Sequence, residues 1–130
     1  MRVCMVTDNY YPYVGGIAEH VHHLSVELRK RGHVVKVLTS KFEGRTIDCL
    51  DHVPDEEHIK RVGRGLIIRS NKSFCRIPIA VRPVARTRRF FRENRFDVIH
   101  VHGALAPTLV LVALNASRAV NVATFHAGHD

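Results

Sequence analysis

The sequence predicts an α/β fold, an open and mostly parallel Rossmann-like sheet with helices on both of its faces. Two observations predict this class. Short runs rich in valine and isoleucine alternate with stretches of helical periodicity, and the first unit has the order strand, glycine turn, helix, short turn, strand. A crossover of this kind joins parallel strands. The length of 130 residues suits one compact domain.

The first strand–helix–strand unit occupies the N-terminal third of the chain. An apolar run over 3–6 predicts the first strand, and a helix follows over about 17–31. Gly32 suits the position just after that helix, and the next strand is expected over 34–38. One apolar stripe recurs along the helix at offsets of four, three and four: Ile17, Val21, Leu24 and Leu28.

The middle of the chain has a weaker pattern. The segment 42–57 is acidic and rich in turn residues, so we expect a surface excursion there. Short strands are predicted over 58–62 and 66–69. Two prolines, Pro78 and Pro83, bracket the start of a helix that is expected to run to about residue 94.

The C-terminal third returns to alternating strands and helices. The expected elements are a strand over 97–102, a helix over 109–114 that Pro107 begins, and a last strand over 120–125.

The composition is that of a soluble globular domain. Hydrophobic residues make up 45% and charged residues 25%, which excludes disordered and fibrous classes. The three cysteines form no CxxC pair, so we expect no disulfide or zinc framework and a reducing, cytoplasmic location. The apolar run at the N-terminus is too short for a secretory signal. The longest mostly apolar stretch, 104–114, is shorter than the roughly 20 residues that span a bilayer.

Gly15 and Gly16 lie between the first strand and the first helix, where an open parallel sheet collects its ligands. Without a Cβ, glycine lets a ligand approach the backbone closely and also adopts a positive φ where a turn requires one. The helix start offers unpaired N–H groups that suit a diphosphate. A tight turn that binds no ligand explains the pair equally well. The dinucleotide fingerprint GxGxxG and the P-loop pattern are both absent.

Positive charge is concentrated in one part of the chain. The net charge is +8, and residues 60–95 hold 12 basic residues against one acid, Glu93. Two adjacent stripes along the predicted helix leave Val84 and Phe91 to face the core: Arg82, Arg86 and Arg89 form one, and Arg88, Arg92 and Arg95 the other. Arginines beside Phe90 suit an anionic membrane surface. Nucleic acid is attracted by the same field, but no nucleic-acid motif accompanies the patch.

The sequence contains 10 histidines, but their spacing does not favour a metal site. The group that follows the glycine turn lacks the i, i+4 spacing of ligand pairs on a helix. His100 and His102 share a strand face, and no cysteine or acidic partner is evident for zinc, so we expect no metal. We expect His100 to be a buried histidine with its hydrogen bonds satisfied. His126 falls just past the last strand, where catalytic groups of α/β folds gather.

Several segments resemble one enzyme family, and three of their motifs are specific: the glycine pair, the His-x-His strand and an Ala-Thr-Phe-His ending. The segments are 14–21, 28–38, 96–102, 106–109 and 122–126. They resemble the N-terminal domain of family 4 glycosyltransferases, which are retaining enzymes with the GT-B fold. Within that family the chain is most similar to phosphatidylinositol mannosyltransferases.

The resemblance implies roles for particular residues. Gly15 and Gly16 match the loop that contacts the donor diphosphate, and His126 matches the histidine beside the transferred sugar. The basic helix matches one that contacts membrane lipid. Two departures concern the acceptor: Asn9 stands where an aromatic residue is expected, and Gly103 replaces an acidic residue. The candidate acceptor-binding residues are Asn9, Tyr10, Tyr11 and His20.

The implied reaction is retaining transfer of a sugar from a nucleotide-diphosphate donor, GDP-mannose, to a hydroxyl of a membrane-associated acceptor such as phosphatidylinositol. No cofactor or metal is expected. The family's C-terminal donor-binding domain has no counterpart in this sequence, so the fragment is expected to be inactive alone and peripheral to the membrane in its longer form. Two alternatives stay open, a family 4 enzyme with a soluble acceptor and a non-catalytic basic α/β module that binds lipid or nucleic acid.

Overall fold

The computed structural model describes residues 1–41, 49–64, 81–103 and 109–126, with side chains left out at 64, 81 and 82. The elements in chain order are β1 (Arg2–Thr7), α1 (Gly16–Lys30), β2 (Val34–Lys41), a 3₁₀ turn η1 (Glu56–His58), β3 (Ile59–Arg64), α2 (Val81–Asn94), β4 (Val98–His102), α3 (Leu109–Ala116) and β5 (Val120–Thr124).

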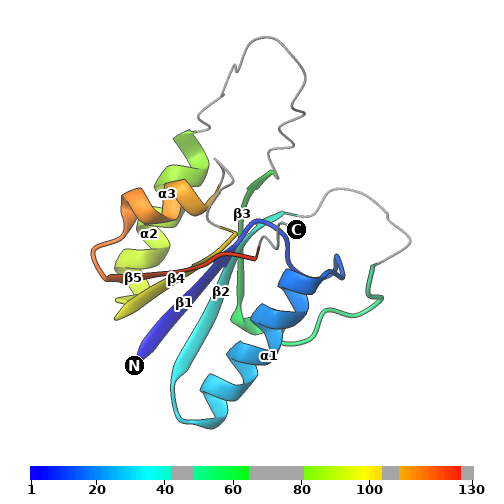
Figure 1. Cartoon of the computed structure of the whole chain (residues 1–130). Helices are drawn as coiled ribbons and strands as arrows, with labels where there is room; N and C mark the ends of the chain where they lie inside the picture. The colour runs from blue at the N-terminus through cyan, green and yellow to red at the C-terminus, as the bar shows by residue number, and fades with distance from the viewer. Residues whose placement is uncertain (42–48, 65–80, 104–108, 127–130) are drawn as a thin grey trace.

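The five strands form one sheet in the order β3-β2-β1-β4-β5, and every neighbouring pair is parallel. The chain builds outward from β1 to β2 and β3, and then returns to the other side of β1 for β4 and β5 (Figure 1). The predicted α/β class and the parallel sheet are therefore confirmed. The connections reverse direction between β1 and β4, so a ligand crevice is expected at the carboxyl ends of these two strands.

Helix α1 covers one face of the sheet (Figure 1). Alternate residues of β1 and β2 point to this face, and Val21 of α1 packs against them while it is fully buried. The predicted stripe is confirmed, because Ile17, Leu24 and Leu28 pack against the same cluster. The buried residues of this α1-side core are Val3, Met5, Tyr10, Tyr11, Ala18, Val21, Val35 and Val37.

Helices α2 and α3 cover the opposite face and contact each other. The intervening residues of β1, Cys4 and Val6, point to this side, as the two-residue period of a strand requires. Phe90 of α2 and Val110 of α3 are buried against them. The full set of buried residues in this second core is Cys4, Val6, Leu38, Val62, Phe90, Ile99, Val101, Leu109, Val110 and Ala113.

The predicted elements agree with the structure to within a few residues. Helix α1 begins one residue earlier than expected, and β2 continues three residues further, to Lys41. The predicted strand over 66–69 and the roles of Pro78 and Pro107 lie outside the described residues. Strand β5 is an edge of the sheet, and Val120 is 65% exposed there. Within the described ranges, no helix has the length and apolar character needed to cross a bilayer.

Replacement of Gly63 is expected to destabilise the domain strongly. Gly63 in β3 has a φ of +66°, and a Cβ at this position would lie only 2.7 Å from Cγ of Pro83 at the start of α2. A positive φ costs a non-glycine residue about 1–2 kcal/mol, and the rigid proline ring must also move. We expect Gly63→Ala to lower the free energy of unfolding in urea by about 3 kcal/mol.

Gly32→Ala is the matched control, because Gly32 also has a positive φ, +87°, but a Cβ there meets no atom within 4 Å. Only the backbone cost of about 1–2 kcal/mol applies to it. Equal losses in the two variants would show that the contact between β3 and α2 does not constrain the fold.

Candidate active site

The carboxyl ends of β1 and β4 meet at the switch point of the sheet. Asp8, which follows β1, forms hydrogen bonds with two neighbouring elements, α3 and β2. Its Oδ1 accepts a hydrogen bond of 3.1 Å from the N–H of Leu109, the first residue of α3. Its carbonyl accepts one of 3.3 Å from Oγ1 of Thr39 in β2. The loop between β1 and α1 is thus fixed where ligands of open α/β sheets bind.

The glycine pair stands at the start of α1, as the sequence predicts. Gly15 is the N-cap residue with extended φ and ψ of −163° and 164°, and no side chain caps the helix. The first intrahelical bond runs from the N–H of Glu19 to the Gly15 carbonyl at 3.0 Å, so the N–H groups before it have no acceptor within the helix. Gly16 is exposed, and a Cβ on it would meet nothing within 4 Å. Neither glycine has a positive φ.

Three histidines from distant parts of the chain gather beside this helix start. His20 lies one turn into α1, His102 ends β4, and His126 follows β5. His102 Nδ1 and His126 Nε2 are 3.1 Å apart, and the ring of His20 lies 5.2 Å from that of His126 and 5.7 Å from that of His102. One nitrogen of each ring lies within 4.8 Å of one nitrogen of the other two. Three imidazoles therefore share one small volume.

Burial disfavours the charged form of two histidines of the cluster, His102 and His126, and of the neighbouring His100. Burial, together with a smaller effect of the neighbouring imidazoles, lowers the pKa of His102 to about 3. Burial also lowers the pKa of His126 and of His100. His100 stacks on His102 with ring centroids 4.2 Å apart, and its Nε2 lies 2.7 Å from Oγ1 of Thr124. His100 is thus a partly buried histidine with a hydrogen-bond partner, as expected, although the partner comes from the neighbouring strand.

The candidate acceptor-binding residues divide into two groups. Tyr10 and Tyr11 are each 3% exposed and belong to the α1-side core. The Tyr11 hydroxyl donates a 2.7 Å hydrogen bond to Oε1 of Glu19, and the Tyr10 hydroxyl lies 3.4 Å from Nδ1 of a helix histidine. Asn9 and His20 are exposed at the edge. An acceptor role for Asn9 and His20 stays a prediction, whereas the tyrosine side chains hold α1 against the loop.

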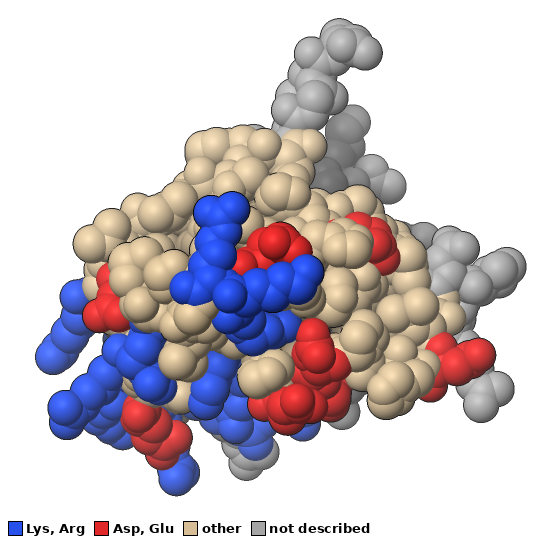
Figure 2. All heavy atoms as spheres, turned by 90° about the horizontal axis from the view of Figure 1, so that it is seen from below, with Lys and Arg blue, Asp and Glu red and all other residues tan. Residues whose placement is uncertain are grey.

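The basic helix is present as α2, and most of its arginines face solvent. Arg86, Arg88, Arg92 and Arg95 are exposed, whereas the side chain of Arg82 lies outside the described residues. Arg89 is also exposed, but its Nε donates a 2.7 Å hydrogen bond to Glu93 one turn later. Figure 2 shows Lys and Arg side chains gathered over one side of the molecule, seen from below.

The expectation for Phe90 is wrong. The sequence pattern places it beside the arginines at a membrane surface, but it is only 7% exposed and packs in the core beneath α2 and α3. Its ring lies 5.4 Å from that of Phe96, and the Lys36 ammonium lies 5.9 Å from its centroid. Thr87, three residues before it, is also fully buried, so both residues lie on the face of α2 that packs against the sheet.

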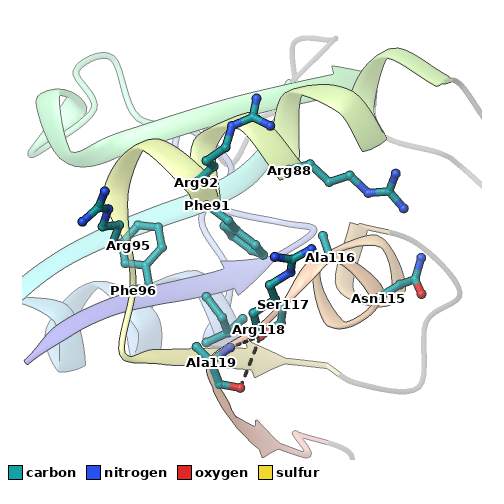
Figure 3. Close-up of a pocket in the computed structure, with 11 residues that line it drawn as sticks. Arg88, Phe91, Arg92, Arg95, Phe96, Asn115, Ala116, Ser117, Arg118 and Ala119 are labelled. Atoms are coloured by element: carbon teal, nitrogen blue, oxygen red, sulfur yellow. Dashed lines mark hydrogen bonds between the residues drawn. The ribbon is translucent and has the colours of Figure 1, made fainter.

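A groove of about 720 Å³ lies between the C-terminal ends of α2 and α3. Its lining combines cationic side chains with an aromatic surface supplied by Phe91 and Phe96 (Figure 3). These residues are next to the beginnings of β4 and β5. The groove therefore lies at the amino ends of the strands, whereas the histidine cluster lies at their carboxyl ends. The arginines that line it are Arg88, Arg92, Arg95 and Arg118.

Sequence reasoning missed two of these arrangements. The local spacing of the histidines argues against a cluster, yet His20 joins His102 and His126 through the packing of α1 on the sheet. One signal was available. His102 and His126 fall at the carboxyl ends of predicted parallel strands, and His20 falls at the start of the helix that follows such a strand. Arg118 lies outside the basic segment, and it joins the groove because the turn before β5 passes beside the end of α2.

Comparison with known proteins gives a consistent result. The model of Glycosyltransferase Family 4 matches residues 14–130. The chain is 32% identical over 126 residues to a phosphatidyl-myo-inositol mannosyltransferase of Mycolicibacterium smegmatis, and 30% identical to one of Propionibacterium freudenreichii subsp. shermanii. These matches cover 97% of this chain but 31% and 33% of the relatives. The chain thus spans about a third of the length of these relatives.

Two further similarities extend the comparison. A segment of 44 residues is 42% identical to one subunit of the phosphatidylinositol N-acetylglucosaminyltransferase of Homo sapiens, covering 34% of this chain and 9% of that protein. The fold matches a sucrose-phosphate synthase of Thermosynechococcus elongatus with a TM-score of 0.58 and 16% identity, over 97% of this chain and 33% of that one. At that identity the second likeness supports the fold alone.

The stability of the domain is expected to fall on mild acidification because of His102. An unfolded chain protonates this imidazole near its ordinary pKa of 6.5, whereas the folded chain does so only near a pKa of about 3. Between pH 6.5 and 3 the unfolded state binds more protons than the folded state does. The contribution of neutral His102 to the free energy of unfolding is therefore fully present above pH 6.5 and decreases as the pH falls toward 3. From pH 7 to 5 we expect His102 to cost about 2 kcal/mol.

The measurement is the free energy of unfolding in urea at pH 7 and pH 5, with EDTA present so that protons are the only cations that bind the cluster. His102→Gln is expected to remove most of the loss, although it lowers stability at both values. A variant with the same pH dependence as the unmodified chain would contradict the assignment to His102.

Proposed function

We propose that the natural protein that contains this chain transfers a sugar from a nucleotide-diphosphate donor to a hydroxyl group with retention of configuration. The basis is that this chain belongs to glycosyltransferase family 4. We infer GDP-mannose as the donor and phosphatidylinositol, or a similar membrane lipid, as the acceptor. The observation that carries this proposal is the uncapped start of α1 at Gly15 and Gly16, one helical turn from the cluster that contains His126.

The first step of the proposal is donor binding at the glycine pair. The free N–H groups and the positive end of the α1 dipole suit a diphosphate, and they stabilise the charge that develops as it leaves. Gly16 needs no positive φ, and the space beside its Cα is empty. Neither backbone conformation nor packing thus explains this glycine, whereas close approach of a ligand does.

The second step assigns a positioning role to His126 toward the transferred sugar. Its ring is partly exposed, and His102 fixes it by a 3.1 Å contact while the lowered pKa keeps it uncharged. With Nε2 of His126 paired to His102, its Nδ1 is left for one hydrogen bond with a sugar hydroxyl, which orients the sugar against the leaving diphosphate. The scheme assigns no acid or base role to His126 and requires no metal ion.

The acceptor is inferred from the named relatives and from the charge on this chain. Two kinds of relative carry phosphatidylinositol in their names, with mannosyl transfer in one and N-acetylglucosaminyl transfer in the other. A lipid acceptor requires contact with a membrane, and we propose that α2 supplies it from the cytoplasmic face. Arg86, Arg88 and Arg92 are exposed and form no ion pair with another described residue.

Gly16→Val is expected to abolish donor turnover and leave the fold intact. The branched side chain fills the empty space beside the helix start, where the diphosphate must approach. Valine is not worse than glycine inside a helix, so the free energy of unfolding should change by less than about 0.5 kcal/mol. The assay measures transfer of labelled mannose from GDP-mannose to phosphatidylinositol by the natural protein that contains this chain.

Glu27→Val is the matched control, since it adds the same side chain to an exposed position of the same helix, eleven residues further along. Its turnover should equal that of the unmodified protein. A folded Gly16→Val protein with full turnover would remove the glycine pair from the mechanism.

Replacement of Arg86, Arg88 and Arg92 by Gln tests the membrane contact. Each basic residue near an anionic surface adds about 1 kcal/mol, so vesicle binding should weaken by up to about 3 kcal/mol, and less at high salt. Co-sedimentation with vesicles of phosphatidylglycerol and phosphatidylcholine, and with phosphatidylcholine alone, measures this effect.

The control variant carries Arg89→Gln and Glu93→Gln, which removes an ion pair of the same helix without changing the net charge. It should bind anionic vesicles as the unmodified chain does. Equal sedimentation of the triple variant at low salt would exclude the membrane role, and binding to nucleic acid would then be tested as the explanation of the charge.

A further inference from the structure

The histidine cluster holds a buried polar group that the protein leaves unsatisfied. His102 is 1% exposed, and its Nε2 has no hydrogen-bond partner in the described part of the chain. Its other ring nitrogen, Nδ1, meets only Nε2 of His126, at 3.1 Å. Buried polar atoms in native proteins are nearly always satisfied, so an exception indicates a role or an absent ligand. Only Nε2 of His102 thus lacks a partner, whereas Nδ1 pairs with another imidazole and is the ring nitrogen that faces the cluster.

The spacing of the three rings matches the coordination of a tetrahedral metal ion. Zn²⁺ binds imidazole nitrogen at about 2.0–2.1 Å, which places two ligand nitrogens about 3.4 Å apart. The nitrogens of His102 and His126 are already at 3.1 Å, and that of His20 lies within 4.8 Å of both. His20 is exposed on α1, so its side chain is free to turn the remaining distance inward. Three ligands leave a fourth position open to water.

The chemistry of the ligands selects the class of ion. Three neutral imidazoles suit Zn²⁺, Co²⁺, Ni²⁺ and Cu²⁺, whereas Mg²⁺ and Ca²⁺ prefer oxygen ligands. The rings are held from separate elements, α1, β4 and the segment after β5, and the sheet register fixes two of them: His102 pairs with Thr124, two residues before His126. The fold therefore preorganises two of the three ligands, His102 and His126, for a borderline-soft ion.

We propose that His20, His102 and His126 form a binding site for a divalent transition-metal ion of the zinc class. The ion replaces the hydrogen bond between His102 and His126: the proton of that bond is released to solvent, and one nitrogen of each of the three rings donates its lone pair to the ion. An ion at this position occupies the ring of His126. It therefore competes with the sugar, and this consequence alone rests on the proposed function.

The test uses this chain, expressed without a histidine tag and freed of metal with EDTA. Titration with Co²⁺ is expected to produce the visible absorption of a four-coordinate ion, saturating at one ion per chain, and Zn²⁺ should displace it. Mg²⁺ should not. His20→Ala is the principal variant, because the side chain is exposed and its loss leaves the core intact. His126→Ala is the second.

Each of the two variants is expected to raise the Co²⁺ dissociation constant by at least about tenfold, since even loss of an outer-shell partner costs 10–100-fold. His23→Ala is the matched control, an exposed histidine of the same helix outside the cluster. Its dissociation constant should stay within about twofold of the unmodified chain.

Two results would overturn the proposal: no saturable Co²⁺ absorption, or an equal loss of affinity in His23→Ala and His20→Ala. Both readouts need no sugar donor. Failure of glycosyl transfer would thus reject the proposed function without touching the metal site, and failure of Co²⁺ binding would reject the metal site alone.

Discussion

Strand β1 is buried on both faces, and the remaining elements are arranged around it. Its side chains from Val3 to Thr7 are at most 5% exposed. A strand with two apolar faces needs a partner strand on each side and helices above and below, which is the situation of parallel sheets in α/β proteins. Here β2 and β4 flank β1, α1 covers one face, and α2 with α3 covers the other. Burial of this one strand therefore sets the layers.

The same arrangement explains the chemistry of the carboxyl edge. Ile99 and Val101 point into the core under α2 and α3, so the two-residue period turns His100 and His102 toward α1. There they meet a helix whose start is uncapped and electropositive. Burial lowers the pKa of His102 and of His126, and an uncharged imidazole does not repel the partial positive charge of the helix start. The proposed binding of a diphosphate and a sugar side by side is consistent with this arrangement.

The exposed arginines of α2 lie away from that cluster. The exposed arginines of α2 lie on the opposite face of the sheet from α1, and the groove that they share with Arg118 lies at the opposite edge from His126. Burial is the largest cause of the lowered pKa values of His100, His102 and His126. The basic surface of α2 and the histidine cluster are therefore separate features of one small domain.

The sequence by itself determined the class of fold, the order of the elements and the glycine turn, because these depend on local periodicity and on the conformational preferences of single residues. Only the tertiary structure decided which side chains meet. Phe90 belongs to a basic helix in the sequence but lies in the core, since the rotation of α2 is set by its packing on the sheet. His20 shows no ligand spacing with its neighbours, yet it meets His102 and His126 because parallel strands end at one edge and α1 returns across it. Contacts between residues a hundred positions apart depend on strand order and helix packing, and neither is encoded in the local pattern around any one of those residues.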